Sequence, residues 1–211
     1  MNPFQYPEQK HSRSQAPGPF TDYRRYKPFL QIEFGRQCVY CRLPDGTKGA
    51  DVFCVDHYRP KSRFPKLECI YANLFYACPA CNRRKGAFWP AEEELLRGMF
   101  IPNPCDHSMA EHLKYEGARV EPLTRAGRRA EEELILNGEV DVAYREVVLR
   151  FIEAGKLNIM TGRATLEALD MQLDRAEGVE REELLLECRE IRGRLEGFQK
   201  ALERFTGLKL T

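Results

Sequence analysis

The sequence contains no apolar run near the roughly 18 residues that a transmembrane helix needs, so no membrane span is expected. Its first residues, MNPFQYPEQKHSRSQ, lack the charged and then apolar pattern of a secretory signal. Repeats of solenoid length are also missing. We therefore expect a cytoplasmic globular protein with no membrane partner, whose 211 residues suffice for one ordinary domain or two small ones.

Cysteines are plentiful, and eight are present. Without a secretory signal, closely spaced pairs favour metal binding over disulfides. Cys38 and Cys41 form one CxxC pair, and Cys78 and Cys81 form a second. Two such pairs are typical of a structural zinc site, which is closed to water; free cysteines or a thiol redox pair are the alternative. The remaining cysteines are predicted to be small core residues: Cys54, Cys69, Cys105 and Cys188.

Charge is distributed unevenly, although the formal net charge is only +1. Residues 1–90 hold 15 Lys and Arg against 7 Asp and Glu, a net charge of +8, and the remainder has a net charge of −7. The basic half is therefore the part expected to contact a polyanion. The alternative is that helices with unequal solvated faces produce the same imbalance.

Composition along the chain indicates three parts and an α+β fold. Residues 1–22, rich in proline and polar residues, are predicted to be a flexible arm, and residues 23–90 a compact metal-stabilised module. Residues 91–211 are predicted to form a mainly α-helical domain. The helices expected from periodicity and from Gly and Pro breaks cover residues 23–34, 92–97, 108–115, 125–136, 139–154, 162–176 and 180–205.

The last predicted helix carries a heptad seam. Its apolar positions follow alternating steps of four and three residues, which is typical of a coiled coil. Two arrangements fit this pattern equally well, an antiparallel pairing with the preceding helix and a homodimer through the C-terminal helix. The seam residues are Leu184, Cys188, Ile191, Leu195, Phe198, Leu202 and Phe205.

An Asp-His pair lies between the two CxxC pairs. Residues 53–58 are rich in β-forming residues and predict a strand that ends near Asp56 and His57. Pro79 can open a helix, which places Asn82 in its first turn, directly after the second zinc pair. We therefore expect zinc binding to fix the strand hairpin against this helix and to bring Asp56, His57 and Asn82 within reach of one another.

The order of these residues resembles the HNH endonucleases, whose fold is the ββα-metal finger. The similarity runs from about residue 37 to residue 86, through CxxC, Asp56-His57, Asn73-Leu74 and CxxC-Asn82. The resemblance implies that His57 is the general base and that Asp56 binds a catalytic divalent cation. It also implies that Asn73 braces the loop and the histidine, and that Asn82 supplies the second cation ligand, as in the HNN variety of the motif.

Elementary chemistry agrees with these implied roles. Magnesium takes oxygen ligands and retains several waters, so a carboxylate, an amide oxygen and a phosphate could hold it. A neutral imidazole with a pKa near about 6.5 can accept a proton from water at neutral pH. The expected function is a metal-dependent DNA endonuclease with a one-metal mechanism, structural Zn²⁺ and catalytic Mg²⁺ or Mn²⁺. Its products would carry a 5′ phosphate and a 3′ hydroxyl.

Basic residues around the pair predict a groove that binds the DNA backbone with little sequence selectivity. A weaker likeness to stand-alone bacterial HNH proteins, some encoded beside ATPases in antiphage systems, implies a regulatory partner such as an ATPase and a role in an antiphage or restriction-type system. The alternative function is a non-catalytic zinc module that binds nucleic acid or protein. The predicted DNA contacts are Arg59, Lys61, Arg63, Lys66, Arg83, Arg84 and Lys85.

A second Asp-His pair, Asp106 and His107, follows Cys105 and precedes His112. No CxxC with an asparagine follows it, and prolines precede it, as in a loop that meets a helix. We therefore interpret Asp106 as a residue at a helix N-terminus and both histidines as structural or surface residues.

Overall fold

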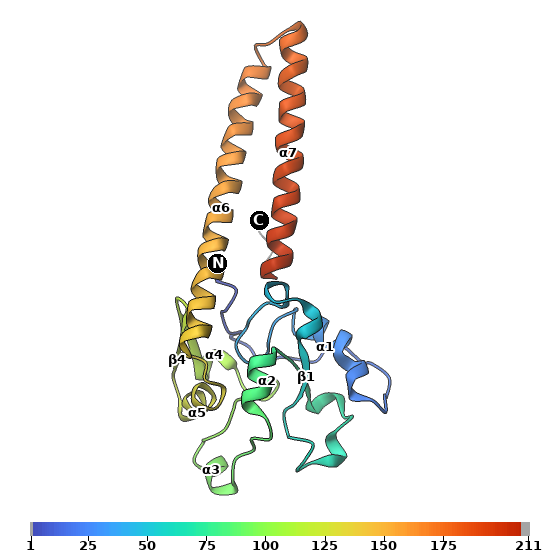
Figure 1. Cartoon of the computed structure of the whole chain (residues 1–211), viewed down its shortest axis with the longest axis vertical. Coiled ribbons are helices and arrows are strands. Elements are labelled where there is room, and N and C mark those ends of the chain that lie inside the picture. Colours follow the sequence, from blue (N-terminus) through green and yellow to red (C-terminus); the bar gives the residue numbers. More distant parts are fainter. Residues whose placement is uncertain (1, 208–211) are drawn as a thin grey trace. The chain divides into compact units, whose positions relative to one another are not determined.

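The computed structural model describes residues 2–207 and divides the chain into two compact units, Met1–Glu146 and Val147–Thr211. Small antiparallel sheets and many helices confirm the α+β class (Figure 1). The boundary predicted at residue 90 does not separate the two units, because the following residues up to Glu146 belong to the first. None of the helices within residues 2–207 is long and apolar enough to cross a membrane.

Short elements joined by turns make up the first unit. A two-stranded hairpin is followed at once by a helix, in the order predicted between the two CxxC pairs. In chain order the elements are η1 (Tyr23–Tyr26), α1 (Lys27–Glu33), η2 (Asp45–Thr47), η3 (Ala50–Val52), β1 (Cys54–His57), η4 (Pro65–Leu67), η5 (Tyr71–Asn73), β2 (Leu74–Ala77), α2 (Pro79–Lys85), α3 (Glu92–Leu96), α4 (Met109–His112), β3 (Leu113–Glu116), β4 (Arg119–Pro122), α5 (Arg125–Leu134) and the first residues of α6 (Glu139–Leu173).

The hairpin and helix form where the local sequence favours them. β1 and β2 pair antiparallel, with Asp56 opposite Phe75 and His57 opposite Leu74. Cys78 is the N-cap of α2 and proline takes the first helical position, which suits a residue without a backbone N–H. Both β2 and the inner face of α2 are buried, so the hairpin and α2 share one core.

A second hairpin occupies part of a predicted helix. Residues 108–115 were expected to be helical, but only α4 is, and β3 and β4 then pair antiparallel. The local sequence alternates, with Leu113 and Tyr115 buried and Lys114 exposed, which is the period of a strand with one covered face. Gly117 supplies the left-handed conformation, φ 58°, that this tight turn requires.

The arm predicted over residues 1–22 is packed against the unit, which corrects the expectation of a flexible segment for residues 2–22. Phe4 and Tyr6 are buried, and both rings contact Tyr115. The guanidinium of Arg13 lies 4.9 Å from the ring centre of Phe34 and donates to the carbonyl of Leu74. The polar composition of residues 2–22 gave no sign of these contacts in the sequence.

Glu33, at the end of α1, fastens the same arm. Its carboxylate accepts hydrogen bonds from the backbone N–H groups of Ser14 at 2.7 Å and Gln15 at 3.0 Å. The Tyr71 hydroxyl donates to it at 2.9 Å, and the His11 ring lies at 3.0 Å. Burial acts to raise the pKa of Glu33, but these hydrogen bonds outweigh it and hold the pKa below its ordinary value of 4.5.

Replacing Glu33 is therefore expected to destabilise the protein in a pH-dependent way. Glu33→Gln should lower the free energy of unfolding by about 2 kcal/mol at neutral pH, because hydrogen bonds to a charged group are lost. Since the pKa is lower in the folded state than in the unfolded state, this stabilisation is present above the unfolded pKa and is lost as the pH falls through the folded pKa. Urea unfolding of both proteins at about pH 7 and about pH 3 measures it. A difference of equal size at both pH values would contradict this explanation.

Gly127, in the first turn of α5, lies against the chain at the end of α4. A Cβ at this position would be 1.9 Å from the backbone carbonyl oxygen of His112. Gly127→Ala should therefore cost about 2 kcal/mol or more in unfolding free energy, measured by chemical denaturation. Gly193→Ala is the matched control, because its Cβ would meet nothing within 4 Å, and it should stabilise α7 (Gly178–Thr206) by about 1 kcal/mol. Equal stability of Gly127→Ala and the unchanged protein would show that the contact is absent.

The second unit is an antiparallel pair of helices, formed by α6 from Val147 onward and by α7. Leu169 and Leu173 of α6 form a buried cluster with Cys188 of α7, and the rings of Phe151 and Phe205 are 5.1 Å apart. The heptad seam is thus filled within the chain, which confirms the intrachain pairing. A homodimer would need another face.

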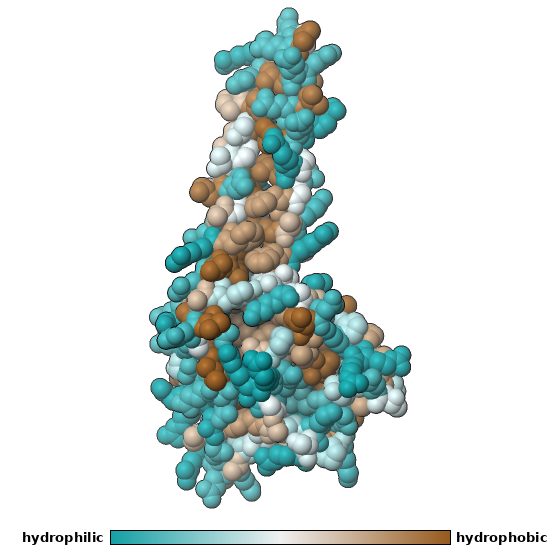
Figure 2. Space-filling view, viewed as in Figure 1, coloured by the Kyte–Doolittle hydropathy of each residue, from teal (hydrophilic) through white to brown (hydrophobic). Residues whose placement is uncertain are grey.

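α6 is one continuous helix, where the sequence predicted two, over residues 139–154 and 162–176. Gly155 was expected to follow the first helix and Gly162 to begin the second, but both lie inside α6 and face α7. A Cβ on Gly162 would be 2.5 Å from a methyl carbon of Leu195, so glycine permits close approach of the helices. Hydrophobic side chains also reach the surface of this hairpin (Figure 2), among them Leu157, Met160, Met171 and Leu186.

Candidate zinc centre and active site

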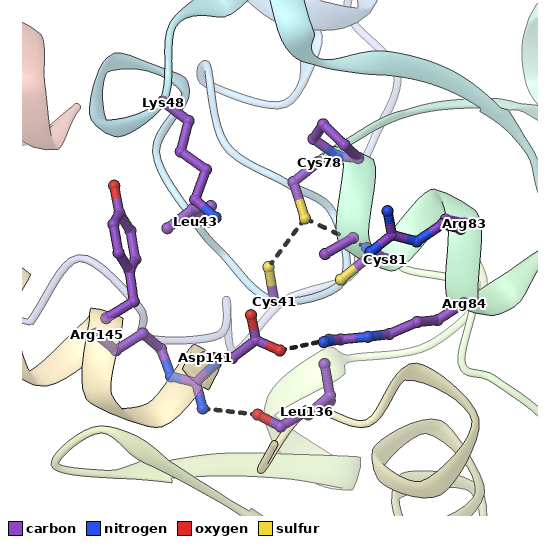
Figure 3. Close-up of a pocket in the computed structure, with 13 residues that line it drawn as sticks. Cys41, Leu43, Lys48, Cys78, Cys81, Arg83, Arg84, Leu136, Asp141 and Arg145 are labelled. Carbon is purple, nitrogen blue, oxygen red and sulfur yellow. Dashed lines mark hydrogen bonds and ion pairs between the residues drawn. The ribbon is translucent and has the colours of Figure 1, made fainter. Parts of the chain in front are cut away.

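The four cysteines of the CxxC pairs meet in one buried cluster. Their sulfur atoms all lie within 4.8 Å of one another, and those of Cys41 and Cys78 are 3.7 Å apart (Figure 3). A tetrahedral zinc ion with Zn–S bonds of about 2.3 Å requires sulfurs about 3.8 Å apart. Cys38, Cys41, Cys78 and Cys81 therefore fit a structural zinc ion.

The charges of the cluster point to the same conclusion. Hydrogen bonding from the Cys38 sulfur holds the pKa of Cys78 well below its ordinary value, whereas interactions with Cys38 raise the pKa of Cys41 and Cys81. Four thiolates in one buried cluster would repel one another. A dication removes this conflict, because zinc binds deprotonated thiols.

A cavity of about 180 Å³ lies next to the cluster and is rich in cationic side chains (Figure 3). Arg84 forms an ion pair with Asp141, and Arg145 donates to the carbonyl of Leu136. Four zinc-bound thiolates carry a net charge of −2, so neighbouring cations compensate a buried anion. The cationic residues that line the cavity are Lys48, Arg83, Arg84 and Arg145.

Backbone contacts hold the first CxxC turn against the hairpin. The N–H of Cys38 donates to the carbonyl of Leu43, and the N–H of Val39 donates to the carbonyl of Tyr76 in β2. From β3, the Tyr115 hydroxyl donates to the carbonyl of Cys41 at 2.9 Å. The cysteine cluster thus joins the β1–β2 hairpin to the β3–β4 hairpin. The sequence did not predict the β3–β4 hairpin.

Asp56 is enclosed, with only 3% of its surface exposed. One carboxylate oxygen accepts a hydrogen bond of 2.6 Å from the hydroxyl of Tyr40, which lies between two zinc ligands. The ammonium of Lys85, from the last turn of α2, lies 3.2 Å from both carboxylate oxygens and donates to the carbonyl of His57 at 2.6 Å. Lys85 itself is only 2% exposed.

This arrangement does not offer the open carboxylate that a divalent cation needs. The oxygens of Asp56 are already bonded to a hydroxyl and to a positive charge. A second cation on the same carboxylate would face the Lys85 ammonium across a buried site, where like charges repel strongly. The donor types suit magnesium, but the carboxylate can receive it only if Lys85 withdraws.

His57 faces the opposite side of the hairpin, because successive strand residues point to opposite faces. Its Nε2 lies 2.9 Å from the carbonyl oxygen of Glu68, and the edge of its ring contacts Tyr23 at 4.6 Å between centres. An N–H at Nε2 satisfies that carbonyl and leaves Nδ1 as an acceptor. Burial lowers the pKa of His57 from its ordinary value of 6.5, against the opposing effects of the Glu68 carbonyl and Asp56, so the imidazole is neutral at pH 7.

Asn73 is buried and bridges the segments around His57. Its side chain accepts from the N–H of Arg59 at 2.9 Å and donates to the carbonyls of Arg59 at 3.0 Å and Leu67 at 3.3 Å. The backbone carbonyl of Asn73 accepts a hydrogen bond from the N–H of Tyr58. These bonds hold the chain that follows His57 against the start of β2.

Asn82 lies on α2, beside the hairpin face that carries Asp56. Burial raises the pKa of Cys54, and the nearby Asn82 side chain acts against this rise. Cys54 and Asp56 are two residues apart in β1 and so share one face. The structure therefore brings Asp56 and Asn82 to the α2 side of the hairpin and His57 to the other side.

Some of the residues predicted to contact DNA are exposed, and others are bound to groups within the protein. Lys85 cannot reach a phosphate, because it is buried on Asp56, and this part of the prediction was wrong. Arg84 is bound to Asp141 and to the carbonyls of the last residue and the C-cap of α5. Lys61 pairs with Glu68 and Arg63 donates to the carbonyl of Trp89, but both are exposed. The exposed cations of the predicted set are Arg59, Lys61, Arg63 and Lys66, with Arg83 on α2.

The second Asp-His pair forms a local turn. The Asp106 carboxylate accepts from the Asn103 side chain at 2.8 Å, and His107 lies 3.3 Å from the Asn103 carbonyl. His112 pairs with the Thr124 hydroxyl at 2.7 Å. The residue before α4 is Ser108, so the interpretation of Asp106 as the residue at the helix N-terminus was wrong.

Two side chains at the site were missed. Tyr40 binds Asp56 and Tyr23 covers the His57 ring, yet neither belongs to the motif. Tyr40 could have been noticed, because a tyrosine between two zinc ligands is fixed in place with its hydroxyl in need of a partner. Tyr23 gave no such signal, since it lies 34 positions before His57.

Comparison with known proteins agrees with this geometry. Residues 38–88 match the family model described as HNH endonuclease, which confirms the resemblance of the zinc-centred hairpin and α2 to that family. The chain is 24% identical over 157 residues to Septu protein PtuB of Bacillus thuringiensis. The matched part covers 72% of this chain and 53% of that protein, so the chain spans about half the length of this curated relative. No solved structure gives a significant match.

Proposed function

We propose that this protein, whose residues 38–88 carry an HNH endonuclease domain, hydrolyses phosphodiester bonds in DNA with His57 as the general base. The observation that carries the proposal is the state of His57. The Glu68 carbonyl orients its ring at 2.9 Å, and burial keeps it neutral at pH 7. A positioned neutral imidazole with a free nitrogen can accept the proton of an attacking water.

Neighbouring cations would hold the substrate. The Lys61 ammonium lies 2.9 Å from Glu68 and 4.7 Å from the ring centre of Tyr23, on the His57 side of the hairpin. Arg59 lies over the ring of Trp89 at 5.2 Å and is exposed. Such side chains bind DNA phosphates with little sequence selectivity, so we expect cleavage without a strict recognition site.

Dependence on Mg²⁺ or Mn²⁺ is part of the proposal, because HNH nucleases use divalent metals. Such an ion would stabilise the charge that develops on the scissile phosphate and on the leaving oxygen. Asp56 and Asn82 are the residues proposed to hold it once the carboxylate of Asp56 is released. Zinc, in contrast, would hold the fold and take no part in hydrolysis, since four sulfurs complete its coordination.

A role in antiphage defence, together with a protein partner such as an ATPase, is proposed from the similarity to the Septu protein. The apolar side chains on the surface of the α6–α7 hairpin offer a place for such a partner. The buried Asp56–Lys85 pair favours the alternative function, a zinc module that binds DNA without cutting it. Both functions share the basic surface and differ in hydrolysis.

Incubation of supercoiled plasmid with the purified protein tests the proposal. Relaxed and linear plasmid should form with Mg²⁺ or Mn²⁺ and not with EDTA, and end-labelling should reveal 5′ phosphates. A gel-shift assay in EDTA measures DNA binding separately. Binding without cleavage under every metal condition, in the presence of the native partner as well, would reject the nuclease and favour the binding module.

A further inference from the structure

The internal cation at Asp56 distinguishes this site from an open metal site. Lys85 is the last residue of α2, and its ammonium lies 3.2 Å from both oxygens of the Asp56 carboxylate. Both side chains are almost fully enclosed. A buried pair of this kind persists only where charge and hydrogen bonds compensate the loss of water.

Lys85 is held by a second contact that points along the same strand. Its ammonium donates to the carbonyl oxygen of His57 at 2.6 Å, a shorter distance than the one to the carboxylate. The lysine could therefore leave the carboxylate and keep a hydrogen bond to the strand. Because the lysine side chain has a flexible stem, small rotations are enough to change which oxygen it contacts.

Tyr40 holds the other side of the Asp56 carboxylate in place. The 2.6 Å hydrogen bond from its hydroxyl orients the carboxylate from the zinc turn, between Cys38 and Cys41. The carboxylate thus has one permanent neutral partner and one charged partner that can be exchanged. Electrostatics makes only the charged partner incompatible with a metal ion.

We infer that Lys85 occupies the cation position of Asp56 in the resting protein and competes with the divalent metal for that carboxylate. This inference rests on the proposed function, since it assigns to Asp56 the cation that hydrolysis would use. The Lys85 ammonium must move away from the carboxylate when the metal binds, and the affinity for metal is lowered by the strength of the ion pair. Lys85 would thereby keep the nuclease inactive at low metal concentration.

Removal of the lysine charge should therefore strengthen metal binding. Lys85→Met keeps the length of the side chain and should lower the dissociation constant for Mn²⁺ by about tenfold or more, because a like charge at short range is removed. Binding is measured by the loss of the free-Mn²⁺ electron paramagnetic resonance signal, with the zinc-loaded protein and without DNA. The double variant Asp56→Asn/Lys85→Met removes both charges and should bind no Mn²⁺ at this site.

A measurement on the unchanged protein covers the case in which Lys85→Met does not fold. With ¹³C-labelled lysine, titration with Mg²⁺ should shift the ε-methylene resonance of Lys85, assigned by comparison with Lys85→Arg. If Mg²⁺ binds and this resonance does not move, the lysine does not compete. Equal or weaker Mn²⁺ binding by Lys85→Met, or no Mn²⁺ binding by either protein, would also overturn the inference.

The two proposals can fail separately. Mn²⁺ binding that follows the predicted order, together with an uncut plasmid, would leave the inference standing and reject the nuclease. Plasmid cleavage that needs Mg²⁺, together with unchanged Mn²⁺ affinity in Lys85→Met, would do the reverse. In that case the metal would be held away from Asp56.

Discussion

His57→Ala is expected to reduce plasmid cleavage by about a thousandfold, while the protein stays folded and still binds DNA. A positioned general base typically contributes between about 10² and 10⁴ in rate. The imidazole is held by the Glu68 carbonyl at 2.9 Å, and an N–H at Nε2 leaves Nδ1 as the acceptor, so removal of the ring should affect the chemical step. Initial rates of nicking at saturating Mg²⁺, with gel-shift affinities measured in EDTA, separate cleavage from binding.

His107→Ala is the matched control for this variant. His107 also follows an aspartate, but it lies in a turn against the Asn103 carbonyl, outside the residues 38–88 that match the HNH family model. The rate of this variant should equal that of the unchanged protein. If His57→Ala cut at the normal rate, or if His107→Ala lost activity to the same extent, His57 would not be the base.

Loss of the zinc ion is expected to unfold the first unit around its hairpin. Binding of a structural zinc ion is worth about 10–16 kcal/mol in small zinc modules, more than a domain of this kind gains from its core alone. Cys78→Ser removes the ligand that is also the N-cap of α2, so the helix and the hairpin should separate. Circular dichroism and zinc content by mass spectrometry measure both effects, and cleavage should disappear with them.

Cys69→Ser is the control for the loss of a sulfur. Cys69 is partly exposed and lies outside the four-cysteine cluster. Its thiol donates to the carbonyl of Thr21 at 3.2 Å. This variant should keep one zinc ion per chain and normal cleavage. A Cys78→Ser protein that kept its fold and its zinc would show that the cluster is not a zinc site.

Sequence patterns predicted the centre of the fold well, because zinc ligation and turn chemistry are local. The two CxxC pairs predicted the cluster, the β-forming residues 53–58 predicted β1, and Pro79 predicted the start of α2. These features depend on a few residues with narrow chemical roles. Residues 38–88, which match the HNH family model, include these positions.

These local patterns could not predict packing between residues that are far apart in the sequence. Phe4 and Tyr6 look like residues of a polar arm until β3 provides Tyr115 for them to contact. A gap between two helices was predicted before Gly162, because glycine has a low helix propensity, yet Gly162 lies inside α6 and makes room for Leu195. In both cases the partner lies more than 30 positions away in the sequence.

The sequence could not predict the contacts of the candidate site. Asp56, His57, Asn73 and Asn82 were identified from their order, but Lys85 was assigned to DNA when it is buried on Asp56. The basic run at residues 83–85 does not indicate which of its side chains is buried in the core. That depends on the face of α2 that packs against β1, with Arg83 exposed and Lys85 covered.

The most direct test of this account is a crystal structure of His57→Ala bound to a DNA duplex and Mn²⁺, with anomalous scattering used to locate the metal. The inactive variant keeps the phosphodiester intact. The account predicts a manganese peak in contact with the carboxylate of Asp56 and a DNA phosphate, with the ammonium of Lys85 withdrawn from the carboxylate. Manganese bound elsewhere, with the Asp56–Lys85 pair intact and the DNA on another face of the protein, would contradict it.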